Sequence, residues 1–172
     1  MRCSRVLLTG LLAIACGKTQ AGVQPLESVL RDSSGADVGR VTLKEDGAEI
    51  EVQVRVNGLP PGLHGMHLHE AARCEGPAFQ TAGAHLNPTG KKHGHQNPQG
   101  PHLGDLGNIQ VGGDRRGEVT VEVSGAETQS GLRTFLGLGQ GGLALVIHAD
   151  RDDEVTDPAG NSGARIACAE LR

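Results

Sequence analysis

The chain has 172 residues, a formal net charge of −4, 27 glycines and only two aromatic residues, both phenylalanines. This length favours one domain, and the negative charge argues against a nucleic-acid partner. With aromatic side chains nearly absent, the core has to come from valine, leucine, isoleucine and alanine in a chain with many turns. Such a composition favours short strands and loops over helices.

The N-terminus resembles a targeting segment. Arg2 and Arg5 precede a short apolar run over residues 6–15, which is too short to span a bilayer as a helix. Small residues then lead into Cys16, as in a bacterial lipobox, where the cysteine becomes the lipidated first residue of the mature protein. The alternative is ordinary signal cleavage with a free soluble product. Either reading predicts export into a compartment that permits disulfides.

We therefore predict three parts along the chain. Residues 1–15 form a lipoprotein-type signal peptide, residues 16–25 the anchor and linker, and residues 26–172 one folded domain. The predicted location is the bacterial periplasm or outer membrane, with the membrane contacted only through a lipid on Cys16.

Two of the four cysteines remain for the folded domain. Cys3 is removed with the signal peptide and Cys16 is used if it is lipidated, which leaves Cys74 and Cys168. An even pair in an exported domain predicts a disulfide, with two buried free thiols as the alternative. A bridge that closes so long a loop stabilises the fold by about 4–5 kcal/mol in the loop-entropy model.

Strand signals begin at residue 26. The clearest is the alternation of four apolar residues, from Ile50 to Val56, with Glu51, Gln53 and Arg55. Eight short strands are predicted in all, and they favour an all-β sandwich or barrel. Their ranges are 26–30, 38–44, 50–56, 62–70, 108–111, 119–123, 143–148 and 166–171.

Two long loops interrupt this pattern. Residues 71–105 are dominated by glycine, proline, asparagine and histidine, and they carry four of the eight histidines. Residues 149–164 form a second, charged loop, and residues 125–142 are also loop-like. A structureless stretch of this length is usually functional or disordered. We favour function for residues 71–105, because metal ligation can supply the order that a core cannot.

The histidines have the spacing of metal ligands. His67 and His69 lie two apart on a predicted strand, so both rings point to one face and can chelate one ion; chance histidines on a polar strand are the alternative. Six imidazoles and one carboxylate exceed one tetrahedral site, and they suit two four-ligand sites that share a histidine. Imidazole suits copper and zinc. The candidate ligands are His67, His69, His85, His93, His102, Asp105 and His148.

Six motifs in a fixed order carry a resemblance to a known family. They are Gly62–Glu70, Ala82–Pro88, His93, His102–Asn108, Leu143–His148 and Gly160–Cys168. Together they resemble the copper/zinc superoxide dismutases of the bacterial exported type, over roughly residues 26–171. The fold that this resemblance implies is an eight-stranded Greek-key β-sandwich or barrel with two long functional loops.

The resemblance also implies the ligand sets. It places copper on His67, His69, His85 and His148. It places zinc on His85, His93, His102 and Asp105, so that His85 bridges the two ions. Copper cycles between two oxidation states while zinc has no redox chemistry, so copper is the reactive ion and zinc the structural one. In the family's scheme, His85 also passes a proton to the product.

Further roles follow from the resemblance. Arg165 is the expected guide for the superoxide anion, although a surface strand charge is the alternative. Asp152 is expected to connect His67 and His93 from behind, with an ordinary charged loop residue as the alternative. His64 is expected to be structural, and His95 to be a solvated loop residue.

The predicted function is dismutation of superoxide to dioxygen and hydrogen peroxide, with copper and zinc as cofactors. The main alternative is an exported copper- and zinc-binding protein without catalysis. The expected partner is the superoxide anion, with no nucleic acid. The sequence is compatible with a monomer and with a homodimer.

Overall fold

The computed structural model describes residues 24–172. The predicted signal peptide, the lipidation site Cys16 and most of the predicted linker lie outside the described residues. Within residues 24–172, no helix is long and apolar enough to cross a membrane.

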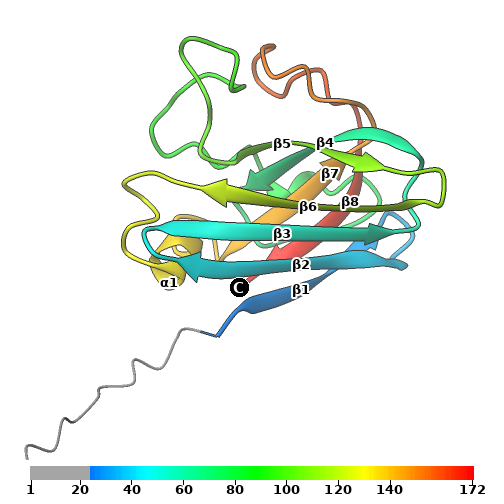
Figure 1. Ribbon diagram of the computed structural model, residues 1–172, viewed down its shortest axis with the longest axis horizontal. Coiled ribbons are helices and arrows are strands. Elements are labelled where there is room, and N and C mark those ends of the chain that lie inside the picture. The colour runs from blue at the N-terminus through cyan, green and yellow to red at the C-terminus, as the bar shows by residue number, and fades with distance from the viewer. Residues whose placement is uncertain (1–23) are drawn as a thin grey trace, which may run out of the picture.

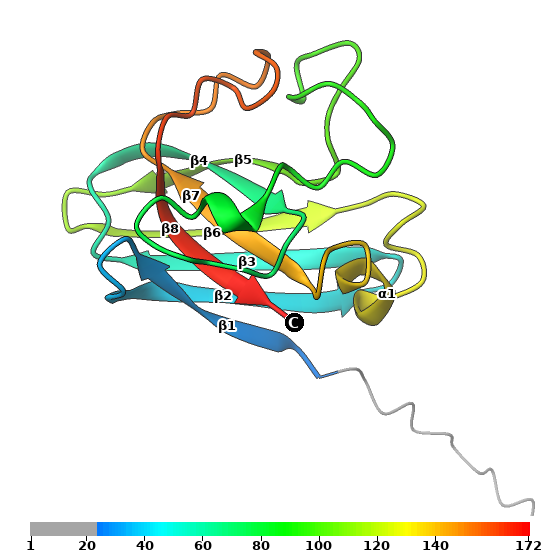
Figure 2. The same ribbon diagram turned by 180° about the vertical axis from the view of Figure 1, so that it is seen from behind.

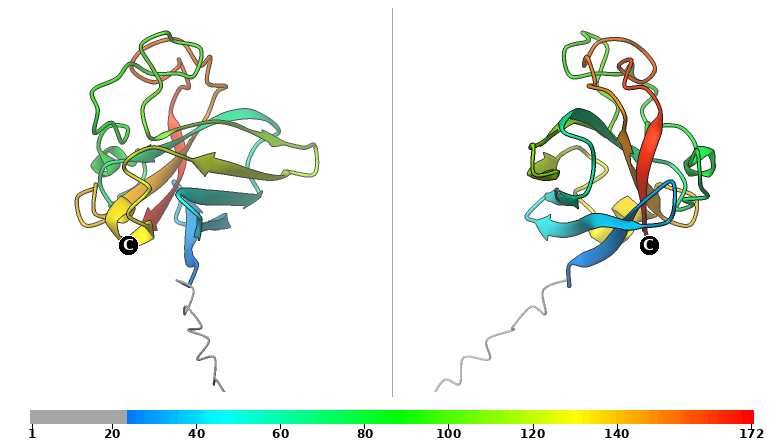
Figure 3. Two further views of the ribbon diagram at one scale, coloured as in Figure 1. Left: turned by 60° about the vertical axis from the view of Figure 1, so that its left-hand side comes forward. Right: turned by 90° about the vertical axis from the view of Figure 1, so that its right-hand side faces the viewer.

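Eight antiparallel strands form one curved sheet (Figure 1). They are β1 (Leu26–Asp32), β2 (Asp37–Asp46), β3 (Glu49–Asn57), β4 (Gly62–His69), β5 (Asp105–Val111), β6 (Arg116–Val123), β7 (Leu143–His148) and β8 (Arg165–Leu171). The strand order is β5-β4-β7-β8-β1-β2-β3-β6, so the β3–β4 and β6–β7 connections cross the sheet as in a Greek key. The sheet curls until β5 and β6 lie side by side without a ladder between them, which makes a nearly closed barrel (Figure 3).

The alternation predicted for β3 builds the core. Ile50, Val52 and Val54 are fully buried and Val56 nearly so, while the residues between them face outward. Strands β2 and β6 flank β3 in register, and their apolar residues pack from both sides. The predicted all-β architecture is confirmed.

Strand β7 is buried on both faces, which explains why its sequence is continuously apolar. Leu143, Leu145 and Ile147 belong to the barrel core. Ala144 and Val146 point the other way, into a second small cluster with Phe79 and Cys168. The segment after β4 therefore lies against the outside of the barrel.

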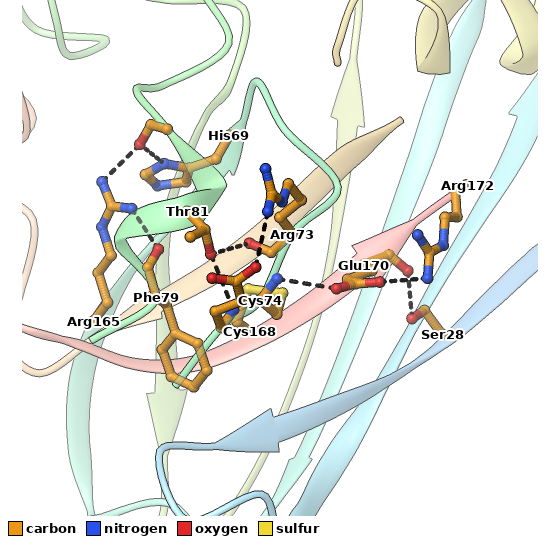
Figure 4. The surroundings of a disulfide bond; sticks show 12 residues. Ser28, His69, Arg73, Cys74, Phe79, Thr81, Arg165, Cys168, Glu170 and Arg172 are labelled. Carbon is orange, nitrogen blue, oxygen red and sulfur yellow. Dashed lines mark hydrogen bonds and ion pairs between the residues drawn. A yellow bond between two sulfur atoms is a disulfide. The ribbon is translucent and has the colours of Figure 1, made fainter. Parts of the chain in front are cut away.

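A disulfide between Cys74 and Cys168 ties this segment to β8, with 5.7 Å between the Cα atoms. The Cys74 amide donates to the Glu170 carboxylate at 3.0 Å, next to the bridge (Figure 4). The predicted disulfide is confirmed.

The structure departs from the predicted elements in four main places. Strand β6 begins at Arg116 rather than residue 119. Strand β5 begins at Asp105 rather than residue 108, because a register shift in β4 after Gly65 lets Asp105 pair with His67. A short helix α1 (Leu132–Leu136) lies within the predicted loop, and a 3₁₀ turn η1 (Gln80–Ala82) lies in the first long loop. Elements of one turn are too short to show a periodic pattern.

Candidate metal centre

Both long loops lie at one end of the barrel, beside the ends of β4 and β7 (Figures 1 and 2). The structure brings all seven predicted ligands together there, and each is buried or at the edge of burial. Their exposed fractions are 0% for His67, His69 and His93, 4% for Asp105 and His148, 6% for His102 and 9% for His85.

Strand register places three of these rings. His67 and His69 lie on one face of β4, as their spacing predicts. In the β4–β7 ladder, His67 pairs with Val146 and Met66 with Ile147, so His148 ends β7 beside them. The ring centroids of His67 and His148 lie 4.8 Å apart.

Backbone hydrogen bonds hold the first long loop against β4. The Leu68 amide donates to Gly104 O at 2.8 Å, and the Leu68 carbonyl accepts from the Leu86 amide at 2.8 Å. His85 forms an isolated bridge with His69, so its ring lies over the strand. A Cβ at Gly104 would overlap the Leu68 carbonyl, which requires glycine for this close approach.

Three imidazole nitrogens at the centre have no hydrogen-bond partner among the described residues. They are His67 Nδ1, His69 Nε2 and His148 Nε2. In each ring the other nitrogen donates to an oxygen: Asp152 Oδ2 at 2.6 Å, Gly83 O at 3.0 Å and Gly163 O at 3.1 Å, respectively. These bonds fix the tautomer, so each unpartnered nitrogen presents a lone pair. Together with His85, the three rings form a cluster whose ligand atoms lie within 4.8 Å of one another.

Burial keeps these three rings neutral. It lowers the pKa of His67 to about 3, of His69 to about 2 and of His148 to about 4. Buried, neutral imidazoles with converging lone pairs fit a copper ion and are costly otherwise, because unpaired buried polar atoms destabilise a fold. We call His67, His69 and His148 the imidazole side of the centre.

The second half of the centre is built around one carboxylate oxygen. Asp105 Oδ1 lies 3.1 Å from His85 Nδ1, 3.0 Å from His93 Nδ1 and 3.2 Å from His102 Nδ1. The nitrogens of His85 and His102 lie 3.4 Å apart. Asp105 Oδ2 accepts the Gly94 and His102 amides at 2.8 and 3.0 Å. We call His93, His102 and Asp105 the carboxylate side of the centre.

These separations fit zinc. A tetrahedron with Zn–N bonds of 2.0–2.1 Å has edges of roughly 3.3–3.4 Å. The three distances to Asp105 Oδ1 and the distance between the His85 and His102 nitrogens are close to that value. Burial alone would lower the pKa of His93, but hydrogen bonds to Asp105 and Asp152 raise it to about 10. Burial likewise opposes ionisation of Asp105, yet hydrogen bonds from His85, His93 and Gly94 hold the pKa of its carboxyl well below the usual range.

His85 joins the two halves. Its ring stacks on His67 with centroids 4.0 Å apart, and its Nδ1 faces Asp105. His85 and His67 are the two members common to both groups of closely spaced ligand atoms, and the second group contains His67, His85, His93 and Asp105 without the predicted ligand His102. A single imidazole with one nitrogen toward each side is the arrangement that a shared ligand requires.

Asp152 connects the halves a second time from behind. Its Oδ2 accepts from His67 Nε2 at 2.6 Å and its Oδ1 from His93 Nε2 at 3.0 Å. The Asn108 side chain holds the Asp152 backbone in two hydrogen bonds, of 3.0 and 2.8 Å. The resemblance to the family predicted the contacts of Asp152, whereas the role of Asn108, the last residue of the motif His102–Asn108, was not predicted.

Arg165 lies at the edge of the imidazole side. Its guanidinium donates to Phe79 O and to Gly83 O, both at 2.8 Å. The Gly83 carbonyl also accepts from His69 Nδ1, so one loop carbonyl fixes both side chains (Figure 4). The positive charge of Arg165 contributes to lowering the pKa of His69 and of His148.

The remaining two histidines lie outside the cluster. His64 Nδ1 bonds to His148 O at 2.8 Å and its Nε2 to Pro60 O at 2.9 Å, a structural position in the strand. His95 is about half exposed and pairs with Glu154, which raises its pKa. His95 was expected to be a solvated loop residue, and its pairing with Glu154, which lies 59 residues away in the chain, was not predicted.

A nearly closed β-barrel with an imidazole side, a carboxylate side and one shared histidine defines a protein built to hold two unlike metal ions, one of them suited to redox chemistry. Comparison with known proteins agrees. The family model of copper/zinc superoxide dismutase matches residues 38–171. A curated relative from Aquifex aeolicus, Superoxide dismutase [Cu-Zn] 2, is 39% identical over 172 residues that cover 98% of both chains.

Two solved structures share the fold. A superoxide dismutase-like protein of Bacillus subtilis superposes with a TM-score of 0.77 at 36% identity, covering 85% of this chain and 97% of its own. The Cu/Zn superoxide dismutase of Brucella abortus gives a TM-score of 0.69 at 26% identity, covering 87% and 100%. The chain belongs to the copper/zinc superoxide dismutase family.

Proposed function

We propose that this chain dismutes superoxide at the buried centre, with copper on His67, His69, His85 and His148 and zinc on His85, His93, His102 and Asp105. The observation that carries the proposal is the set of three unpartnered imidazole nitrogens beside a histidine that also faces a carboxylate site. A structural role alone does not explain buried lone pairs that converge without a partner.

The reaction converts two superoxide anions and two protons into one dioxygen and one hydrogen peroxide. Bound copper supplies the one-electron oxidation and reduction that this needs, and zinc supplies none. The chain's contribution begins with Arg165, whose planar guanidinium attracts and orients a small anion. Its fixed position beside His69 matters because the net charge of the chain is −4, so attraction has to be local.

His85 is the proton carrier in this proposal. Because its Nδ1 faces Asp105, its Nε2 is the atom turned toward the imidazole side. That nitrogen can hold a proton and release it to the reduced product, while the carboxylate side keeps the ring in place. Asp152 orients His67 and His93 through their outer nitrogens, so the two halves keep one geometry during turnover.

A rate assay on purified protein tests the proposal. Samples carrying both metals, copper only and zinc only are compared with copper in the same buffer. We expect catalysis well above the buffer control only where copper is present, because zinc cannot change oxidation state. A doubly loaded chain that is no faster than copper in buffer would instead identify a metal-binding protein without catalysis.

We further infer that the protein is exported and anchored by a lipid on Cys16, with residues 1–15 as signal peptide, residues 16–25 as anchor and linker, and the domain in the bacterial periplasm or at the outer membrane. The basic residues, short apolar run and small residues before Cys16 support this. Cys16→Ser is expected to move the protein from the membrane fraction to the soluble fraction. A wild-type protein that is soluble, with a mature N-terminus other than residue 16 by mass spectrometry, would contradict the anchor.

A further inference from the structure

The two long loops touch each other outside the metal cluster, at residues that the mechanism does not use. The contact joins residues 92–97 of the first loop to residues 154–157 of the second, and the two loops lie side by side in Figures 1 and 2. We call the side chains that form it the interloop contact: Lys92, His95, Glu154 and Asp157.

Two side-chain pairs make up the interloop contact. His95 Nδ1 lies 2.7 Å from Glu154 Oε2, which also accepts the His95 amide at 3.3 Å. Lys92 Nζ lies 2.9 Å from Asp157 Oδ2. The other oxygen of Asp157 accepts the backbone amide of His93 at 2.9 Å, so the contact reaches a residue of the carboxylate side directly.

The backbones also meet at this point. The Gln96 amide donates to Glu154 O at 3.0 Å, and the Asn97 side chain donates to Val155 O at 3.2 Å. Gly94 has a φ of 96°, and a Cβ there would overlap the Glu154 carbonyl. Only glycine permits this close approach, so Gly94 is required for the contact between the two loops.

Glu154 is the centre of the contact and has a strained backbone. Its φ of 63° lies in the left-handed region, which is unfavourable for a residue with a long side chain. In this conformation its amide donates to Asp152 Oδ1 at 2.6 Å, the oxygen that also accepts from His93 Nε2. Its carboxylate and carbonyl meanwhile bind the opposite loop. One residue thus connects Asp152 on the inside with His95 on the outside.

We propose that Glu154 is a positioning residue that holds the two loops together through His95, and that this contact sets how slowly zinc leaves the protein. The inference rests on the proposed zinc ligands. His93 is fully buried, so zinc can leave only when the loop that carries it opens locally. Opening separates Glu154 from His95, and weakening that pair raises the population of the open form.

The expected effect is modest because the pair is partly exposed, with side-chain exposures of 51% for His95 and 15% for Glu154. Zinc release from the fully loaded chain is followed with an excess of a coloured chelator. Glu154→Ala and His95→Ala are each expected to release zinc about fivefold faster, near the upper limit for such a pair. Glu154→Gln keeps a hydrogen-bond acceptor and is expected to restore part of the retention.

A double-mutant cycle separates this role from general destabilisation. The double variant of Glu154 and His95 is expected to release zinc no faster than either single variant, because both remove one interaction. Glu118→Ala is the matched control, since it breaks a surface pair with Arg55 on the barrel, away from the loops. The zinc release rate of Glu118→Ala is expected to stay at the wild-type value. The urea midpoints of all the variants, this control included, are expected to decrease by similar amounts. Release rates that equal the control, or that multiply in the double variant, would overturn the proposal.

Amide exchange keeps the proposal testable apart from zinc. The Gln96 amide, which donates to Glu154 O, is expected to exchange faster in His95→Ala and not in Glu118→Ala. If the wild-type chain binds no zinc but this amide responds, the proposed ligands fail while the contact between the loops stands. If zinc binds and neither release nor exchange responds, the contact has no positioning role and the proposed function is untouched.

Discussion

The two halves of the metal centre accommodate their buried imidazole rings in different ways. On the imidazole side, three neutral rings direct lone pairs inward, and their outer nitrogens are fixed by Asp152 and two loop carbonyls. On the carboxylate side, the ring nitrogens already contact Asp105 Oδ1 at 3.0–3.2 Å, and His93 is charged. Asp152 supports both halves from behind, but only the carboxylate side has a carboxylate among its own predicted ligands.

This difference matches the work proposed for each half. A carboxylate offsets part of a bound ion's charge and suits a permanent structural ion. The three neutral rings of the imidazole side offset none of it, so this side keeps positive charge with which to attract an anion, and Arg165 adds to that charge. His67 and His85 both lie within the two groups of closely spaced ligand atoms, but only His85 directs a nitrogen at Asp105, so His85 is where the chemistry of the two halves meets.

The largest expected effect is on the pH dependence of stability in the metal-free chain. The three rings of the imidazole side have folded pKa values of about 2 to 4, below the unfolded value of 6.5, so the unfolded state binds more protons as the pH falls below 6.5. The stability that these rings contribute is present above pH 6.5 and is lost in acid, by up to about 4 kcal/mol per pH unit for three groups.

The carboxylate side has the opposite dependence near neutrality. The pKa of His93 is raised to about 10, so its contribution is fully present below pH 6.5 and is lost as the pH rises toward 10. Asp105, whose pKa is lowered, loses its contribution only below about pH 4. Urea unfolding as a function of pH should therefore show an acid limb that His148→Ala reduces and an alkaline limb that His93→Gln removes. A flat profile between pH 4 and 6.5 would show that the two halves do not differ in this way.

Asp105→Asn tests the carboxylate side alone. The substitution removes the carboxylate that contacts all three rings through one oxygen, so we expect the free energy of unfolding to fall by about 3–5 kcal/mol, as for a broken buried ion pair. Urea denaturation measures the change. Asp114→Asn, at an exposed turn, is the control and should change little. A loss equal to the control would mean that Asp105 does not hold this half together.

His148→Ala tests the imidazole side. We expect dismutation to fall by at least about 100-fold, because loss of even an outer partner of a metal ligand costs 10–100-fold. Zinc content should stay near one per chain, since His148 has no atom near Asp105 in the ligand groups. Metal analysis and a rate assay on the same sample measure both. Parallel loss of both metals would show that the halves are not separable.

Of the four predictions, Arg165→Ala is expected to have the smallest effect. The apparent second-order rate should fall about tenfold and depend less on ionic strength, because local attraction of the anion is lost. Copper and zinc contents should not change, since Arg165 bonds to loop carbonyls and not to a ligand atom. Arg165→Lys keeps the charge but lacks the planar guanidinium, so its rate should lie between those of the wild type and Arg165→Ala. An unchanged salt dependence would argue that Arg165 has no steering role.

The barrel and the ligand set could be predicted from the sequence for different reasons. Period-2 alternation in residues such as Ile50 to Val56 is local, so the strands could be assigned without knowing their neighbours. His67 and His69 are also a local signal. The convergence of His85, His102 and His148 is not local, and it was predicted only through the resemblance of ordered motifs.

What could not be predicted are individual contacts between polar residues that lie far apart in the sequence. The Asn108 side chain hydrogen-bonds to the Asp152 backbone, 44 residues later in the chain, and His95 pairs with Glu154, 59 residues later. Both are polar residues of ordinary type whose partners depend on how two loops dock. The one-turn helix α1 was missed because five residues show no periodicity, and its N-terminus depends on a hydrogen bond from the Leu132 amide to Glu45, a distant strand residue.

The most direct test of the central claim is a copper titration of the zinc-loaded chain, with the decay of superoxide measured at each step. We expect the rate to rise in proportion to added copper and to stop rising at one copper per chain, because a single imidazole side exists in residues 24–172. Copper that binds without raising the rate above that of copper in buffer, or a rate without a break at one equivalent, would contradict this expectation.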